Sequence, residues 1–305
     1  MNNYRGRFAP SPSGPLHFGS LVAALGSWLD AKSNQGLWLV RMEDIDPPRE
    51  VPGAAADILR ALERYGLLWD EDVSYQSNNL ADYQEIIEQL LAEQKAYRCI
   101  CSRKQIKLKG AIYQNTCRDK SYDLNQGLNN NLNHGQKNDH SIRLKMTNPL
   151  TSFSDCYQGD CLVESQFSSE DFILKRKDGL FAYMLAVVCD DAAQQISHVI
   201  RGADLLETTV QQLNLFKILN KKAPIYGHLP LAVNSQGLKL SKQNHAKGIS
   251  SDHISENLWQ ALSFLQQSPP NELRHESKDN LLQWAIKSWR PQAFAGKTQI
   301  THKDN

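Results

Sequence analysis

The sequence predicts an α/β protein: a parallel sheet covered by helices, split by an inserted subdomain and followed by a small helical C-terminal part. Strand and helix patterns alternate over the first 95 residues, as they do at the start of such a sheet. From residue 96 to about residue 181 no long amphipathic helix occurs, and after that the alternation returns. The break in the middle therefore predicts a subdomain inserted into the sheet.

The spacing of apolar residues places the elements of the first half. Residues 10–15 contain three prolines and a glycine, which break any helix or ladder, so we expect a loop there. Apolar residues three and four apart predict helices, and short apolar runs predict strands. The expected order is strand 5–9, loop 10–15, helix 21–29, strand 36–41, helix 58–65 and helix 83–91.

The middle segment holds three clustered cysteines, a basic run and an asparagine-rich stretch, residues 125–138, which we expect to be a flexible polar loop. The patterns that follow predict further helices and strands. Their expected order is helix 181–190, strand 196–201, helix 205–219, strand 226–233, polar loop 237–243, helix 254–265 and helix 273–289.

Composition excludes several classes of protein. Of 305 residues, 41% are hydrophobic and 22% are charged, which are globular values and exclude disordered and fibrous chains. No apolar run approaches the ~20 residues of a membrane span, and the first residues lack the apolar core of a signal peptide. Six cysteines are few for a secreted scaffold. We therefore expect a cytoplasmic protein without a membrane partner.

The near-neutral net charge of +1 conceals two oppositely charged segments. Residues 43–72 carry nine acids against three arginines, and residues 95–120 carry eight bases against one acid. Such a basic block can bind a polyanion on one face of the molecule. The alternative is two solvated surfaces that only keep the protein soluble.

Two short motifs suit phosphate groups. In the first, a proline-rich loop leads through His17 and Gly19 into a predicted helix, whose free N–H groups would face an anion. The alternative for His17 is a helix cap or a packed side chain. In the second, Lys239 and Lys242 flank Ser241 in a polar loop, and would offer two charges and a hydroxyl to a triphosphate.

Together the two motifs resemble the signatures of class I aminoacyl-tRNA synthetases. The resemblance narrows to glutamyl-tRNA synthetases because four stretches occur in the order found in that family: 7–20, 41–46, 199–206 and 239–243. It extends over residues 4 to 243. The resemblance implies a Rossmann-type, doubly wound parallel sheet. This sheet is split by an insert that binds the acceptor and is stabilised by a zinc ion. The implied organisation is residues 1–95 and 181–245 for the two halves of the catalytic domain, 96–180 for the insert and 246–305 for a short helical end.

The resemblance also implies ATP with Mg²⁺ and an aminoacyl-adenylate intermediate, made by positioning and charge neutralisation. It assigns catalysis to His17, Lys239 and Lys242. The implied ATP-binding residues are His17, Gly19, Ser20, Ser241 and Lys242. Ser20 replaces the usual second histidine and Gln243 the usual last serine, which puts roles for those two side chains in doubt.

A glutamate pocket carries over by matching positions. Two arginines can fork onto carboxylates, Glu43 can pair with the ammonium, and Tyr183 and Ser11 can supply neutral hydrogen bonds. The alternative for Glu43 is an ordinary ion pair with Arg41 or Arg49. The residues expected to bind glutamate are Arg7, Phe8, Ala9, Pro10, Ser11, Glu43, Tyr183 and Arg201.

Three cysteines have the spacing of a structural zinc site, which would stabilise the insert: Cys99, Cys101 and Cys117. On spacing alone the fourth ligand is Tyr113, His134, His140 or a water. The resemblance to short members of the family favours Tyr113. The alternative is three free, buried cysteines, which is what we expect of the remaining three, Cys156, Cys161 and Cys189.

Only 62 residues follow position 243, too few for the anticodon-binding domains of full-length glutamyl-tRNA synthetases. The chain therefore resembles short paralogues that transfer glutamate to the queuosine base of tRNA(Asp). The implied partners are ATP, L-glutamate and queuosine-containing tRNA(Asp), and no protein partner is implied. The competing hypotheses are a truncated synthetase that charges a tRNA 3′ end, a non-catalytic tRNA-binding module and a small nucleotidylyltransferase.

Overall fold

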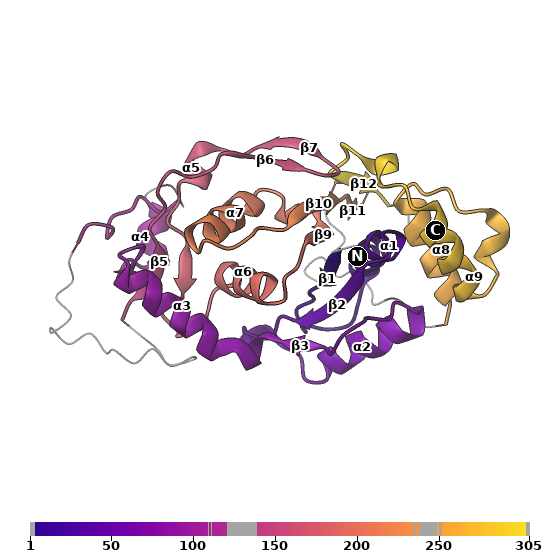
Figure 1. The fold of residues 1–305 in the computed structure, drawn as a ribbon, viewed down its shortest axis with the longest axis horizontal. Coiled ribbons are helices and arrows are strands. Elements are labelled where there is room, and N and C mark those ends of the chain that lie inside the picture. The colour runs from indigo at the N-terminus through magenta and orange to yellow at the C-terminus, as the bar shows by residue number, and fades with distance from the viewer. Residues whose placement is uncertain are drawn as a thin grey trace.

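The computed structural model describes residues 4–108, 110, 112–120, 139–234, 236–237, 249 and 252–302. The expected loop 125–138 lies outside these residues, as does all but Gly237 of the loop expected at 237–243. The molecule is elongated, with α4 (Arg103–Leu108) at one end, the parallel strands in the middle and the last helices at the other end (Figure 1). In the described residues no helix is long and apolar enough to cross a membrane.

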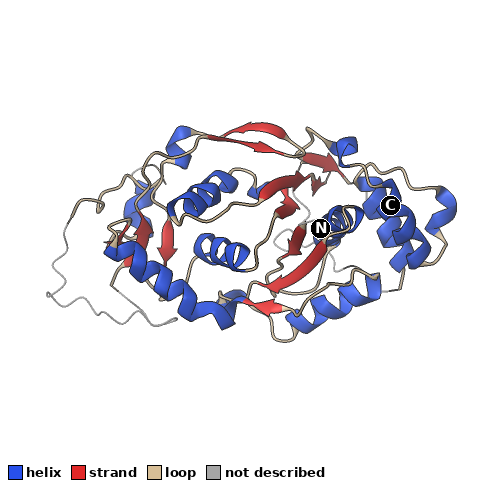
Figure 2. Cartoon of the chain, in the orientation of Figure 1, coloured by secondary structure: helices blue, strands red, loops and turns tan. Residues whose placement is uncertain are grey.

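A parallel sheet forms the centre of the molecule, as predicted (Figure 2). Strand β2 pairs with β1 on one side and β3 on the other, while β9 and β10 form a second parallel ladder. The two ladders adjoin, because the N–H of Ser197 donates to the carbonyl of Arg5 over 2.9 Å. The strands are β1 (Arg5–Phe8), β2 (Leu37–Met42), β3 (Ser74–Tyr75), β9 (His198–Gly202) and β10 (Ile225–Leu229).

Helices cover this sheet, and the expected ones are confirmed with shifted ends. Ten of the sixteen residues of α1 are buried, almost without a break from Leu21 to Ala31, so this helix is enclosed on most sides; the side chain of His17 caps its start. Gly36 after α1 lies so close to Tyr4 that an added Cβ would come within 2.6 Å of it, which requires glycine. The helices are α1 (Phe18–Ser33), α2 (Ala54–Tyr65), α3 (Leu80–Ala92), α6 (Tyr183–Ala193) and α7 (Thr208–Ile218).

The middle segment consists of short elements, as its pattern predicted. Three strands form an antiparallel sheet, β4–β5–β8, and two more form the hairpin β6–β7. Apolar residues of the three-stranded sheet share a core with α3, α6 and α7, so only the cysteine-bearing outer part lacks that support. The elements are β4 (Ala96–Cys99), α4 (Arg103–Leu108), β5 (Ser141–Leu144), β6 (Ser152–Asp155), β7 (Gly159–Leu162), α5 (Ser165–Ser168) and β8 (Ile173–Lys175).

The C-terminal part corrects two expectations. The strand expected at 226–233 is two strands, because Pro230 has no N–H to donate: β10 ends before it, and β11 (Leu231–Val233) pairs instead with β12 (Gln299–Thr301). The helix expected at 273–289 starts later, as α9 (Lys278–Ser288), because the Ser277 side chain caps its first turn.

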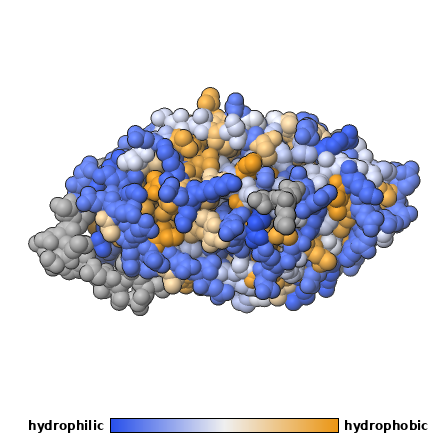
Figure 3. Space-filling model, in the orientation of Figure 1, coloured by the Kyte–Doolittle hydropathy of each residue, from blue (hydrophilic) through white to orange (hydrophobic). Residues whose placement is uncertain are grey.

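The last helices belong to the same core as the N-terminal half. Buried residues of α8 (Ile254–Phe264) and α9 pack with those of α1 and α2 in one apolar cluster. The surface of the molecule that faces the viewer in Figure 3 is mostly hydrophilic, with apolar patches across its middle. Among the three cysteines expected to be buried, Cys161 and Cys189 are, but Cys156 is exposed, which corrects that expectation.

Candidate active site and metal centre

A cavity of about 630 Å³ opens at the carboxyl ends of β1, β2 and β9. Ligands bind at this edge of parallel sheets, where side chains from several strands converge. The cavity brings together predicted glutamate-binding residues from four distant stretches of the chain. Of those expected to bind glutamate, it is lined by Arg7, Phe8, Ala9, Ser11, Glu43, Tyr183 and Arg201, while Pro10 lines the neighbouring cavity.

Arg7 is held in place by a buried carboxylate. Its Nε and one Nη2 hydrogen donate to the two oxygens of Asp191, each over 3.2 Å, and both side chains are almost fully buried. The guanidinium makes no other hydrogen bond to the described residues, so three of its five N–H groups stay available. Arg7 can therefore bind a carboxylate in the cavity without giving up its anchor.

Arg41 is occupied on the side away from the cavity. Its Nη2 donates to Asp191 over 2.6 Å, and its Nε lies 3.6 Å from Asp190. Together Arg7 and Arg41 outweigh the cost of burial and hold the pKa of Asp191 below its usual range. The ion pair of Glu43 with Arg41 or Arg49, weighed above as the alternative, is not formed: Arg41 pairs with the two aspartates, and Arg49 pairs with Asp46.

Glu43 lies just beyond β2, and its Oε1 is buried without a hydrogen-bond partner in the described part of the chain. Burial raises its pKa to about 7, despite the opposing effect of Arg41 and Arg7. An unsatisfied buried carboxylate costs free energy unless a ligand supplies the missing partner. An ammonium group in the cavity would supply that partner and restore the charged form.

Arg201, on β9, is fully occupied by protein groups. A guanidinium has five N–H donors, and here each has an uncharged acceptor. A carboxylate in the cavity would have to replace one of these bonds, and the one to Tyr183 is the longest. The acceptors are His228 Nε2 at 3.1 Å, Tyr183 Oη at 3.4 Å, Gln212 Oε1 at 2.8 Å, the Leu205 carbonyl at 3.2 Å and Thr209 Oγ1 at 2.9 Å.

A second cavity, of about 720 Å³, lies at the start of α1. His17, Gly19 and Ser20 line it, as the ATP assignment requires, and the helix N-terminus favours an anion there. His17 is also a cap, because its Nδ1 accepts from the N–H of Ser20 over 3.3 Å. The other predicted residues of this site, Lys239, Ser241 and Lys242, lie outside the described residues.

The two cavities share a wall. A ligand that spans them would place one end among Arg7 and Glu43 and the other at the start of α1. This arrangement suits an amino acid and a nucleotide that react with each other. The residues that line both cavities are Phe8, Ser11, Ser13, Ala23, Arg49 and Asp204.

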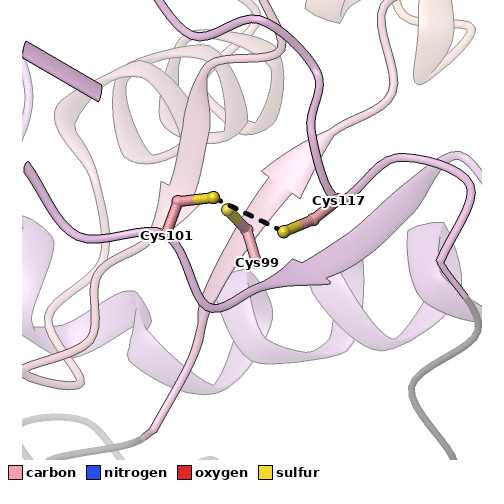
Figure 4. A group of neighbouring side chains, drawn as sticks. All are labelled: Cys99, Cys101 and Cys117. Atoms are coloured by element: carbon pink, nitrogen blue, oxygen red, sulfur yellow. Dashed lines mark hydrogen bonds between the residues drawn. The ribbon is translucent and has the colours of Figure 1, made fainter. Parts of the chain in front are cut away.

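The three predicted metal-binding cysteines meet in the insert (Figure 4). The sulfur atoms of Cys99, Cys101 and Cys117 all lie within 4.8 Å of one another, and those of Cys101 and Cys117 are 3.5 Å apart. Thiolates around a tetrahedral zinc, with Zn–S near 2.3 Å, lie about 3.8 Å apart. The donor set and its spacing therefore fit a metal ion.

Tyr113 is the predicted fourth ligand that lies beside the cysteines. Its hydroxyl accepts from the Cys99 thiol at 3.4 Å and from the Cys117 N–H at 2.8 Å. The Arg143 guanidinium lies 3.8 Å above its ring, while burial raises the pKa of the Tyr113 hydroxyl. His140 is not in the group, and His134 lies outside the described residues.

A family model described as "tRNA synthetases class I (E and Q), catalytic domain" matches residues 3–266. The chain belongs to this synthetase family. It is therefore an enzyme of the ligase type, with the class I catalytic fold, mixed α/β around a parallel sheet. The fold expectation is confirmed at this level.

Curated relatives of this synthetase cover nearly all of the chain. A protein of Vibrio parahaemolyticus named "Glutamyl-Q tRNA(Asp) synthetase" is 49% identical over 301 residues, which are 99% of this chain and 97% of that protein. One of Salmonella paratyphi A with the same name is 49% identical over 289 residues, 95% of this chain and 93% of that protein. The similarity is thus of full length on both sides.

Solved glutamate-specific synthetases share the fold of this chain. The glutamate-tRNA synthetase of Elizabethkingia anophelis matches with a TM-score of 0.77 and 26% identity, over 99% of this chain and 68% of that one. A glutamate tRNA ligase of Elizabethkingia meningosepticum, solved in complex with its amino acid, matches with a TM-score of 0.76 and 26% identity, over 98% and 67%.

Several side chains that shape the site were not predicted from the sequence. Asp191, which anchors Arg7, follows another acid at the end of the apolar run 185–189, and two acids in a buried helix are a signal of buried ion pairs. Asp204, in the wall between the cavities, lies inside a recognised stretch, 199–206. His228 contacts Arg201 from β10, and no pattern in its local sequence indicated this contact.

Proposed function

We propose that the chain activates L-glutamate with ATP and transfers it to the queuosine base at the wobble position of tRNA(Asp). The activation of glutamate is supported by two side chains that lie in the same cavity and are not fully bonded within the protein. Arg7 offers donors to a carboxylate and Glu43 needs a cation, which together fit an amino acid. The names of the full-length relatives support the acceptor.

In this proposal Glu43 binds the ammonium of glutamate and Arg7 one of its carboxylates. Tyr183 and Ser11 add neutral hydrogen bonds from the wall of the cavity. Arg201 holds the hydroxyl of Tyr183 and can exchange that long bond for a carboxylate oxygen. The second carboxylate of the substrate is therefore met by positive charge, which favours glutamate over glutamine.

ATP binds in the second cavity, with its phosphates near the start of α1 and with Mg²⁺ bound to the phosphates. A glutamate carboxylate oxygen attacks the α-phosphorus, a new P–O bond forms, and pyrophosphate leaves with the electrons of the old one. The protein positions the two reactants and neutralises charge. We propose His17, Lys239 and Lys242 as the residues that steady the phosphates.

The adenylate is then attacked at its carbonyl carbon by a hydroxyl of the queuosine ring. An ester forms, AMP leaves, and the hydroxyl proton is released. The insert, residues 96–180, would hold the anticodon stem-loop, because its basic block of residues 95–120 can follow phosphates. Transfer should weaken as salt concentration rises, whereas adenylate formation should respond much less.

The test of the proposal is glutamate transfer to purified tRNAs. We expect glutamate-dependent ATP–pyrophosphate exchange without any tRNA, and transfer only to tRNA(Asp) that carries queuosine. The same tRNA trimmed of its 3′ adenosine should still accept glutamate. Transfer to queuosine-free tRNA, lost on trimming, would identify a truncated synthetase that charges 3′ ends. No exchange under any condition would identify a non-catalytic binding module.

We further propose that Cys99, Cys101, Cys117 and Tyr113 hold a structural zinc ion. The surrounding cluster contains little else that is apolar, so the metal would take the place of a core in the outer insert. Zinc would thereby fix α4, whose Arg103 lines the first cavity. Loss of the metal should therefore harm the insert more than the glutamate site.

Cys101→Ser is expected to lower the zinc content well below one per chain, because a serine hydroxyl is a poor zinc ligand. Transfer to tRNA should fall more than pyrophosphate exchange does. Emission spectroscopy of dialysed protein measures the metal. Cys161→Ser, at a buried cysteine outside the cluster, is the matched control and should keep its zinc. A wild-type protein free of zinc when purified without chelator would refute the proposal.

A further inference from the structure

Three buried side chains form a chain of hydrogen bonds that leads from the β6–β7 hairpin to the glutamate cavity. The Asp155 carboxylate lies 2.5 Å from Nδ1 of His228, and Nε2 of His228 lies 3.1 Å from Nε of Arg201. Their exposed fractions are 4%, 0% and 6%. The three residues come from β6, β10 and β9, so no local sequence motif contains them.

The chemistry of the partners fixes the protonation of His228. A carboxylate only accepts, so Nδ1 must carry the hydrogen that it donates to Asp155. The Arg201 Nε–H only donates, so Nε2 must be the acceptor. Burial lowers the pKa of His228, despite the nearby Asp155, and keeps the ring neutral. The ring thus stays in the one tautomer that both neighbours require.

We propose that Asp155 and His228 are positioning residues for glutamate binding, which hold the Arg201 guanidinium in the orientation that presents Tyr183 to the cavity. This inference rests on the proposed glutamate site and adds two residues to it that do not line the cavity. Asp155 selects the tautomer of His228, and His228 then accepts from Nε, the end of the guanidinium nearest the backbone. The opposite end, Nη1, donates to Tyr183.

Asp155 is itself firmly placed. Its Oδ1 accepts from the backbone N–H groups of Tyr157 and Gln158, both over 2.9 Å, and from that of His228 over 3.2 Å. The hairpin turn is therefore closed around the carboxylate that orients the histidine. Figure 1 shows this hairpin running from α5 towards β11 and β12, so a segment expected to belong to the insert extends along the molecule to the strand β10, which carries His228.

Substitutions at the two positions can distinguish a role in this chain of hydrogen bonds from a role in packing alone. In His228→Gln the amide oxygen can take the place of Nε2 and still accept from Arg201. In His228→Asn the amide nitrogen can still donate to Asp155, but the side chain is too short to reach Arg201. In Asp155→Asn the new NH₂ group favours the opposite tautomer, whose Nε2–H would face the Nε–H of Arg201.

The test measures pyrophosphate exchange at varied glutamate and ATP. We expect His228→Asn and Asp155→Asn to raise the KM for glutamate about 10- to 100-fold, the size of one hydrogen bond to a charged group, with kcat and the KM for ATP changed much less. His228→Gln should stay within about threefold of the wild type. Nitrogen NMR of labelled histidine should report the Nδ1–H tautomer in the wild type and its loss in Asp155→Asn.

Tyr157→Phe is the matched control, because it loosens the same turn by removing the bond from Tyr157 to Asp30 without touching Arg201. An increase in its glutamate KM equal to that of Asp155→Asn would overturn the inference, and so would an unchanged KM in Asp155→Asn. A defect of His228→Gln as large as that of His228→Asn would also overturn it. A wild type without exchange would instead mean that the proposed function has failed, and the inference with it.

Discussion

The Glu43→Gln variant is expected to lose about 10²–10³-fold in kcat/KM for glutamate, the usual result of removing one partner of a buried charge pair. Glutamine has the shape of glutamate but cannot neutralise an ammonium. Pyrophosphate exchange at varied glutamate measures the effect. Asp44→Asn is the control: this neighbouring carboxylate accepts from Ser77 and does not line the cavity, so its kcat/KM should stay near the wild-type value.

The same residue predicts a pH dependence. The ionised form of Glu43 is the one that binds the ammonium, and in the free enzyme its pKa is raised to about 7. The kcat/KM for glutamate should therefore fall as pH drops below about 7, and Glu43→Gln should lack this limb. A wild-type profile that stays flat down to pH 5 would contradict the assignment.

Stability should change in the opposite direction. The pKa of Glu43 is higher in the folded chain than its ordinary 4.5, so its contribution to stability is fully present below about pH 4.5 and is lost as pH rises through about 7. Glu43→Gln removes the buried charge and should stabilise the free protein at pH 8, by up to about 3 kcal/mol. At pH 4.5 it should change little. Thermal unfolding at the two pH values measures the difference.

Arg7→Lys is expected to lower kcat/KM for glutamate by about 10²–10³-fold, although it preserves the positive charge. A guanidinium can bind Asp191 with one edge and a substrate carboxylate with the other, whereas an ammonium is a single point charge that Asp191 would draw away from the cavity. The loss should appear in pyrophosphate exchange, with the KM for ATP little affected.

Arg5→Lys is the matched control for this prediction. Arg5 lies on the same strand two residues earlier, pairs with Glu71 near the surface and does not line the glutamate cavity. The same chemical change at Arg5 should leave glutamate activation within about twofold of the wild type. If Arg7→Lys also activates glutamate normally, Arg7 is not the carboxylate ligand.

The fold was predictable to the extent that it follows from local patterns. Apolar spacing located α2 and α3, because these helices bury one face against a core, and it also located α1, which is buried on most sides. The strand 226–233 was predicted as one from its apolar residues, although Pro230 within it lacks an N–H and could have indicated the break from the sequence alone.

The site was predictable through motifs, and only in part. The residues that face the ligand lie in stretches that the sequence marks, so Arg7, Glu43 and Tyr183 could be named in advance. Their buried supports lie elsewhere: Asp191 on α6 and His228 on β10 contact these residues only through the fold. Arg201 was expected to bind a carboxylate with two of its N–H groups, but in the structure each of its five N–H groups already has a protein acceptor.

The pairing of β11 with β12 has a consequence for the order in which the chain can fold during synthesis. Leu231 and Ala232 form part of the wall of the second cavity, where we propose that ATP binds. The strand that pairs with them, β12, ends at Thr301. His302 then stacks on Phe18, the first residue of α1, with ring centres 4.1 Å apart. A ribosome must therefore release nearly all of the 305 residues before this wall is complete. The parallel strands can form earlier, but the wall of this cavity is complete only once the residues up to His302 have left the ribosome.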